Sequence, residues 1–426
     1  MQSLLDAPPE ILEQILLELD PLDVSSVSQT CTALHDHIYD PSNELLWRDL
    51  YLSMPLDDPR RCFDPLGNPI KHEDIHWRES LQRIIRARTV VRRPELGSSQ
   101  EERLAIAQTL LELASHTVPL DNLASDDISL NLVWVGSMLR EGTFFEQSRW
   151  DVSKQELRLR ARLHTIYGLT LEDFKHQERV ESLCTVYTMR NYSDQNDYGP
   201  FINDGTGRVD WTIVRSIQHL ISLHFIPRPQ TSTGENATMK EPYIPSPMSL
   251  PFCCSVLDSI EVSLDDVDDW AGVEGDWRYA FCFCDHRKLL AFNNYPYPDG
   301  SLRRGRGVFE DADFTEAFNP LELSLHITDA EYDEDHPTRP IIHFKGISKA
   351  DETDVEGTVR ISSEGHIKWQ FVSDDTWSCQ GVQVGNIRSV YGVLGIWTTT
   401  QHEQSDPVGP FWLHKAIGSP PWVLGV

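Results

Sequence analysis

The residues best suited to chemistry are two cysteines and a histidine in the stretch Cys282-Phe-Cys284-Asp-His286. Cysteine and histidine are common zinc ligands, and Cys253-Cys254 could add two more thiols. A structural zinc site usually has two pairs of closely spaced ligands, and the sequence has no second pair of that spacing. Alternate residues of a strand share a face, so two small buried thiols explain Cys282 and Cys284 equally well. We therefore expect no bound metal.

Other sequence signatures of catalysis are missing as well. The chain has no Gly-x-Ser-x-Gly elbow around a serine, and no cysteine has the local sequence of a known nucleophile. The Gly-rich stretches at 205–208 and 303–307 lack the Lys-Ser/Thr ending of a phosphate-binding loop. The acidic run 262–270 lacks the Gly and Glu of a calcium loop. We expect no active site and no cofactor, and a function that depends on binding.

The composition limits which partners are compatible with the chain. The chain has 66 acidic and 37 basic side chains, a formal net charge of −29. This charge argues against nucleic acid as a binding partner, because phosphate binding requires clustered Lys and Arg. No run approaches the roughly 20 apolar residues of a membrane span, and no targeting segment is visible. Eight cysteines in 426 residues do not suggest a disulfide framework. We expect free thiols, no membrane contact, and a cytoplasmic or nuclear location.

The N-terminal segment has the pattern of short amphipathic helices. Pro8 and Pro9 suit the start of one helix, and Asp20 followed by Pro21 suits the start of a second. The first helix has an apolar stripe of Ile11, Leu12, Ile15, Leu16 and Leu19, and the second, over 21–38, has one of Leu22, Val24, Val27, Cys31, Leu34 and Ile38. About 50 residues are near the lower limit for an independent core, so part of this surface needs a covering partner.

The stretches APPEILEQILLELDPLDVSSVSQTCTALHDHI and LLWRDLY, within residues 4–52, resemble an F-box. The resemblance implies a three-helix unit that docks on a Skp-type adaptor. The adaptor, a cullin and a RING subunit together with the F-box protein form an SCF ubiquitin ligase. Ala7 and Val24 stand where leucine is usual, and the lost methylene groups would cost about 1 to 2 kcal/mol at an interface. Alternatively, these helices are the first hairpin of one large domain and pack against residues 70–225. The docking residues that the resemblance implies are Leu5, Pro8, Ile11, Leu12, Ile15, Leu16, Leu19, Leu22, Val24, Val27, Leu46 and Trp47.

The sequence pattern changes twice along the rest of the chain. Residues 53–226 show mostly helical periodicity and are predicted to be a helical connector. Residues 227–255 are rich in proline and predict a linker or loop. From residue 256 to 426, short runs of β-branched and aromatic residues alternate with turn residues, which predicts an antiparallel barrel or sandwich. The expected fold class is therefore α+β multidomain.

The β-rich segment is the expected substrate domain. Residues 268–295 and 381–415 resemble the C-terminal region of fungal F-box proteins, and more distantly F-box receptors with a β-barrel substrate domain. Large aromatic residues here either fill a barrel or line a peptide pocket. The candidate substrate contacts are Trp397, His402 and Trp412. Glycines at 381, 385, 392 and 395 indicate bulges or close backbone approach.

The family resemblance thus implies a substrate receptor of an SCF ligase, which recruits a protein for ubiquitination and proteasomal degradation and catalyses nothing itself. Two alternatives remain open. The first is an F-box protein that binds the adaptor in a scaffolding role outside a ligase. The second is a carbohydrate- or small-ligand-binding β domain, in which Trp397 or Trp412 stacks on a sugar. The acidic excess favours basic or neutral substrates over phosphorylated ones.

Overall fold

The computed structural model describes residues 7–41, 43–97, 99–118, 129–141, 152–170, 172–225, 269–294, 305–311, 313–389 and 391–416. These residues form two compact units. The first contains the described residues up to Glu156 except Pro65–Gly67, and the second contains Pro65–Gly67 and the described residues from Leu157 onward. No helix in these ranges combines the length and the hydropathy that crossing a membrane requires.

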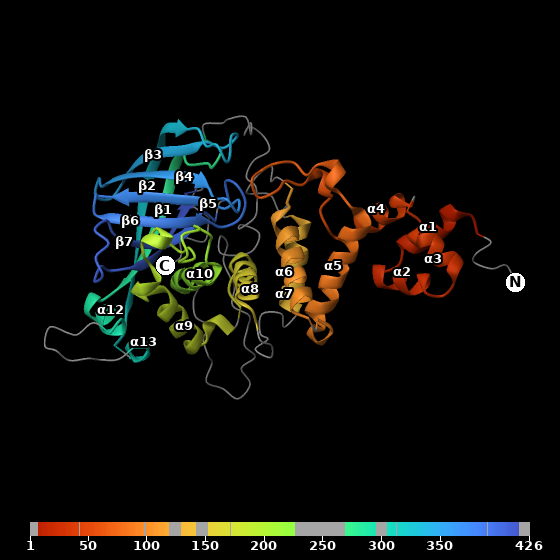
Figure 1. Ribbon diagram of the computed structural model, residues 1–426, viewed down its shortest axis with the longest axis horizontal. Coiled ribbons are helices and arrows are strands. Elements are labelled where there is room, and N and C mark those ends of the chain that lie inside the picture. The colour runs from red at the N-terminus through yellow and green to blue at the C-terminus, as the bar shows by residue number, and fades with distance from the viewer. Residues whose placement is uncertain are drawn as a thin grey trace. The chain divides into compact units, whose positions relative to one another are not determined.

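The first unit is helical (Figure 1). Helix α5 packs against α4, α6 and α7, with an inner face that includes Leu81 and Ile84. Arg83 and Arg86 lie on its exposed side, and Arg83 pairs there with Glu112. The helices are α1 (Pro9–Leu17), α2 (Pro21–Ser28), α3 (Thr32–Tyr39), α4 (Glu44–Leu52), α5 (Trp77–Arg92), α6 (Gln100–Ser115) and α7 (Leu130–Glu141), and α8 (Lys154–Tyr167) begins here and continues into the second unit.

The N-terminal segment has four helices where the sequence predicts three. The helix expected over 21–38 is divided into α2 and α3, and Cys31 between them is extended, with φ −160° and ψ 160°. Hydroxyl groups explain the break: Ser26 Oγ donates to Leu22 O at 2.9 Å, and Thr30 Oγ1 donates to Val27 O at 2.7 Å. Such local bonds compete with the helical ladder, and they end α2 within three turns.

The second unit contains a closed antiparallel barrel, which confirms the expected fold class and decides between barrel and sandwich. Each strand pairs with its neighbours in sequence, and β8 pairs with β1 to close the ring. The turn between β4 and β5 contains Gly365, with φ 75°. The strands are β1 (Gly275–Cys284), β2 (Glu316–Glu331), β3 (Ile341–Ser348), β4 (Asp354–Ile361), β5 (Ile367–Ser373), β6 (Trp377–Gln383), β7 (Val393–Thr399) and β8 (Gly409–Lys415).

Aromatic rings fill the barrel. The Trp277 and Trp369 rings meet edge to face at 5.1 Å between centroids, and the Phe411 ring lies across the glycine pair Gly381 and Gly395. A Cβ at either glycine would collide with that ring, so the small residues make room for the large one. The glycines predicted to mark close backbone approach do so at these two positions and at Gly392, where a Cβ would collide with the backbone oxygen of Leu413.

Helices cover part of the outer barrel surface. Helix α10 (Trp211–Phe225) packs on β7 and β8, and α9 (His176–Val186) packs on α10 (Figure 1). The short helices α12 (His286–Phe292) and α13 (Gly307–Glu310) lie between β1 and β2 in the chain.

The predicted connector, residues 53–226, therefore contributes helices to both units. The predicted linker, 227–255, lies outside the described residues. The domain boundaries at 52, 226 and 255 stay predictions.

Candidate functional site

The two N-terminal helices begin where the sequence predicts. Pro8 is the N-cap of α1 and Pro9 its first residue. Asp20 caps α2 by accepting a hydrogen bond from Leu22 N at 2.9 Å. The same carboxylate pairs with Arg88 of α5, and this hydrogen bond lowers the pKa of Asp20 against the opposing effect of burial. The junction between the two helices is thus fixed by local and by tertiary contacts.

Five of the predicted docking residues face inward. Leu16 is only 1% exposed, and Leu12, Val24, Leu46 and Trp47 are buried as well. The Trp47 indole Nε1 donates to Ile38 O at 3.0 Å, which ties α4 to the end of α3. These side chains form the interior of the helical unit and have little surface to offer a partner.

The other predicted docking residues that the structure describes lie outward. Pro8, Ile11 and Ile15 follow one another at helical spacing along α1, and Ile11 is 52% exposed. Leu22 on α2 is also exposed, and Leu19 and Val27 are half-buried. Leu5 lies outside the described residues. Exposed large apolar side chains grouped on one helix are typical of a surface that another protein covers.

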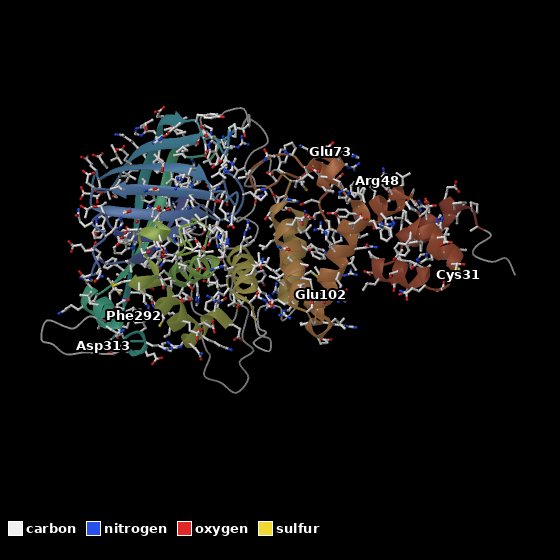
Figure 2. The ribbon with its side chains drawn as sticks, in the orientation of Figure 1. Cys31, Arg48, Glu73, Glu102, Phe292 and Asp313 are labelled. Carbon is white, nitrogen blue, oxygen red and sulfur yellow. The ribbon has the colours of Figure 1, made fainter. Side chains whose placement is uncertain are left out.

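The sequence interpretation missed one strongly exposed residue of this segment. Leu45 is 60% exposed, whereas its neighbours Leu46 and Trp47 are buried. A helical wheel of residues 44–52 separates Leu45 from the inner face, so the signal was present in the sequence. Cys31, at the break between α2 and α3, is an exposed free thiol (Figure 2).

A second candidate site lies at the barrel mouth where β1 ends and β6 begins. Four rings contact one another in series there: Trp377 with Trp397 at 5.3 Å, Trp397 with Phe281 at 6.1 Å, and Phe281 with Phe283 at 6.0 Å between centroids. We call these four residues the aromatic rim. Its outer members are accessible, Trp377 being 38% and Phe283 41% exposed. The rim offers apolar area of the kind that anchors a peptide side chain.

The three predicted substrate contacts have different surroundings. Trp397 belongs to the rim but is itself buried, and its Nε1 donates to Cys282 O at 3.0 Å. His402 stacks flat on Tyr198, with centroids 3.7 Å apart, in the loop between β7 and β8. Trp412 is 1% exposed, and its Nε1 donates to Tyr391 O at 2.6 Å. A ligand has no access to the Trp412 ring in this packing, so we leave it out of the candidate surface.

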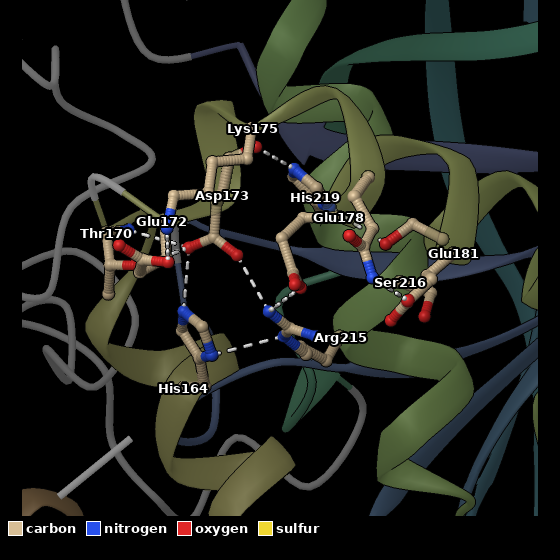
Figure 3. Close-up of polar contacts among 12 residues, drawn as sticks. His164, Thr170, Glu172, Asp173, Lys175, Glu178, Glu181, Arg215, Ser216 and His219 are labelled. Carbon is tan, nitrogen blue, oxygen red and sulfur yellow. Dashed lines mark hydrogen bonds and ion pairs between the residues drawn. The ribbon is translucent and has the colours of Figure 1, made fainter. Parts of the chain in front are cut away.

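The second unit also contains a buried polar cluster around Asp173 (Figure 3). Its Oδ2 lies 2.9 Å from His164 Nε2, and its Oδ1 accepts from Arg215 Nη2 at 2.7 Å. Burial alone would raise the pKa of Asp173, but His164, His219 and Arg215 together hold it well below its usual value.

The cluster includes a serine and a histidine, yet its geometry is not that of a catalytic triad. Ser182 Oγ donates to His219 Nδ1 at 2.8 Å, but His219 Nε2 donates to the backbone carbonyl of Asp173, at 2.7 Å, and not to its carboxylate. Ser182 and His219 are both buried. The hydroxyl cannot reach a substrate from there, and the cluster joins α8, α9 and α10.

Comparison with known proteins bears on the N-terminal helices. The family model of F-box-like domains matches residues 5–53, which span α1 to α4. Compared with curated proteins and with solved structures, the chain shows no significant match. The match covers the same helices that carry the exposed apolar side chains and confirms the resemblance seen in the sequence. Residues 5–53 therefore form an F-box-like domain, and this match supports membership of the F-box protein family.

Proposed function

We propose that this protein is the substrate-recognition subunit of an SCF ubiquitin ligase. The F-box-like domain would bind a Skp-type adaptor, and through it a cullin and a RING subunit, while the barrel unit binds a protein to be ubiquitinated and degraded. Other subunits would perform the catalysis, and the receptor would raise its rate by holding the substrate close. We place this activity in the cytoplasm or the nucleus.

The observation that carries the adaptor half of the proposal is the exposed stripe on α1. Pro8, Ile11 and Ile15 are exposed, whereas Leu12 and Leu16 one residue further along are buried in the same helix. Each apolar face of a short helix is normally covered by other apolar residues. The protein's own core covers one face of α1, and the other face stays exposed and suits a partner. We therefore assign adaptor binding to Pro8, Ile11, Ile15, Leu22 and the newly found Leu45, with Leu19 and Val27 at the edge and Leu5 as a further candidate.

Co-precipitation with the adaptor tests this half. We expect Ile11→Asp with Ile15→Asp to abolish adaptor capture without unfolding the protein, because both side chains face outward. The matched control is Ile347→Asp, since Ile347 is 48% exposed on the outer face of β3. Equal capture of wild type and the double variant would refute adaptor docking through α1. Substitution of Leu12 or Leu16 would be less informative, because it would damage the core first.

The aromatic rim supports the substrate half. Trp377 and Phe283 are exposed aromatic residues at one barrel mouth, joined by rings that continue into the core. Exposed aromatic anchors backed by rigid packing are typical of peptide-binding surfaces. We propose that the rim holds an apolar side chain of the substrate, with His402 in a loop at the same end.

A comparison of the proteins captured with and without cullin inhibition tests whether the aromatic rim binds substrate. We expect a set of captured proteins to accumulate on inhibition, and to be lost when Trp377 and Phe283 are both changed to Ala. Tyr332→Ala is the control, because this exposed aromatic residue lies just after β2, at the opposite barrel end. Capture of adaptor without cullin would instead favour the scaffolding role.

A further inference from the structure

The outer face of the barrel holds a group of three side chains that the sequence does not bring together. His224 comes from α10, Cys282 from β1 and Glu316 from β2. One ligand atom of each, an imidazole nitrogen, a thiol sulfur and a carboxylate oxygen, lies within 4.8 Å of the other two. The three residues are buried or half-buried.

Strand pairing fixes the positions of the thiol and the carboxylate. Glu316 is directly opposite Cys284, and Phe318 is directly opposite Cys282. Glu316 and Cys282 are therefore diagonal neighbours on one face of the sheet. Trp397 Nε1 donates to the carbonyl of Cys282, which adds a second restraint on that part of β1.

The imidazole is placed by stacking. The His224 ring lies against the Phe318 ring, with centroids 5.0 Å apart and planes 19° from parallel. Its Nε2 is 3.2 Å from Glu316 Oε2. The other carboxylate oxygen, Oε1, accepts a hydrogen bond from Tyr187 OH at 2.7 Å, and this outer contact orients the carboxylate.

We propose that His224, Cys282 and Glu316 bind a zinc ion. Zinc bonds of about 2.0 to 2.3 Å place tetrahedral ligands less than about 4 Å apart, so the ligand atoms need to close by roughly an ångström. A mixed sulfur, nitrogen and oxygen set favours zinc over magnesium or calcium, which prefer oxygen alone. Three protein ligands leave the fourth position for water.

Glu316 already has one positively charged neighbour. Arg179 Nη2 lies 3.8 Å from Glu316 Oε2, a separation that leaves this oxygen open to a closer cation. The His224 side chain is 19% exposed and marks the side from which an ion would enter.

Such a site would have a structural effect. It would join α10 to β1 and β2, and so connect the helical layer to two strands of the barrel. Zinc removal would then weaken the attachment of α10, whereas the F-box-like helices would keep their adaptor binding.

Metal analysis of the purified full-length protein tests the proposal. We expect one zinc ion per chain in wild type and its loss in Cys282→Ala. Two controls should keep the metal: Cys379→Ala, which removes a buried thiol inside the barrel, and Cys253→Ala with Cys254→Ala, which removes the thiols outside the described residues. Wild type that lacks zinc after growth with added zinc would overturn the proposal, as would zinc retained in Cys282→Ala but lost in the Cys253 and Cys254 variant.

Cobalt replacement gives a readout that does not depend on one variant folding. Wild type loaded with Co²⁺ should show a thiolate-to-cobalt charge-transfer band in the near ultraviolet and the strong visible bands of tetrahedral cobalt. His224→Gln should lose the tetrahedral bands, and Cys282→Ala the charge-transfer band. An octahedral spectrum without thiolate in wild type would contradict the assignment.

Discussion

Arg88 of α5 holds Asp20 of the α1–α2 junction in a two-bond ion pair, with Nη2 2.6 Å from Oδ1 and Nη1 2.8 Å from Oδ2. Asp20 also caps α2 through Leu22 N. One carboxylate thus starts α2 and joins the α1–α2 junction to α5. The exposed stripe of Pro8, Ile11 and Ile15 owes its position to this residue as well as to the core beneath it.

Two substitutions separate the roles of Asp20. Asp20→Asn keeps a capping oxygen but loses the charge. We expect it to cost about 1 kcal/mol, because the Asp20 side chain is 42% exposed and solvent screens its pair with Arg88. Asp20→Ala also loses the cap, which adds about 1 kcal/mol. Hydrogen exchange of the α2 amides measures both changes. Asp23→Asn, at an exposed site in the same helix, is the control, and equal effects of the two Asp20 variants would show that the cap contributes nothing.

Leu16 and Ile15 are neighbours in α1, but we expect substitution of Leu16 to affect stability and substitution of Ile15 to affect adaptor affinity. Leu16→Ala should lower the stability of the F-box-like helices by about 2 to 5 kcal/mol, because it leaves a cavity at a fully buried position. Ile15→Ala should change stability by less than about 0.5 kcal/mol. Adaptor affinity should nevertheless fall for Ile15→Ala. Denaturant unfolding and calorimetric titration with the adaptor measure the two quantities, and unchanged adaptor affinity would count against the proposed surface.

Lowering the pH should reduce the stability of the barrel unit already at pH values where most carboxylates are still ionised. Burial lowers the pKa of His414 from 6.5 to about 3, so the unfolded chain binds a proton at a pH where the folded chain does not. The stability from this residue is complete above pH 6.5 and is lost progressively as the pH falls toward 3. Melting temperatures between pH 7.5 and 4.5 should fall less steeply in His414→Gln than in wild type. Equal slopes in the two proteins would contradict this account.

Gly395 is required by the close approach of Phe411. A methyl group there would collide with the Phe411 ring and with the carbonyl oxygen of Gln380, which belongs to the paired strand and cannot move aside. We expect Gly395→Ala to destabilise the barrel by about 1 to 3 kcal/mol, the usual cost of overpacking. Gly307→Ala is the control, since no atom lies within 4 Å of a Cβ there. Equal melting temperatures for the two variants would contradict this account.

The sequence determined the elements whose signals are local. Pro8, Pro9 and Asp20 mark helix starts because capping and proline geometry depend on adjacent residues alone. The F-box-like domain was recognised for the same reason, since its residues are contiguous. The short runs of β-branched and aromatic residues predicted the β-rich segment. Gln380 and Gln383 of β6 are polar and buried, so the pattern is broken in that strand.

Tertiary structure decided which side of each element is used. Ile11 and Leu12 are similar in sequence, but only the packing of α1 against α4 makes the first a surface residue and the second a core residue. Trp412 was expected at a ligand and is enclosed by its neighbours. His224, Cys282 and Glu316 lie far apart in the chain and become neighbours only when α10 packs on a closed barrel. The periodicity of apolar residues in the sequence indicates that one face of a helix or strand is apolar, whereas long-range contacts determine which residues cover that face.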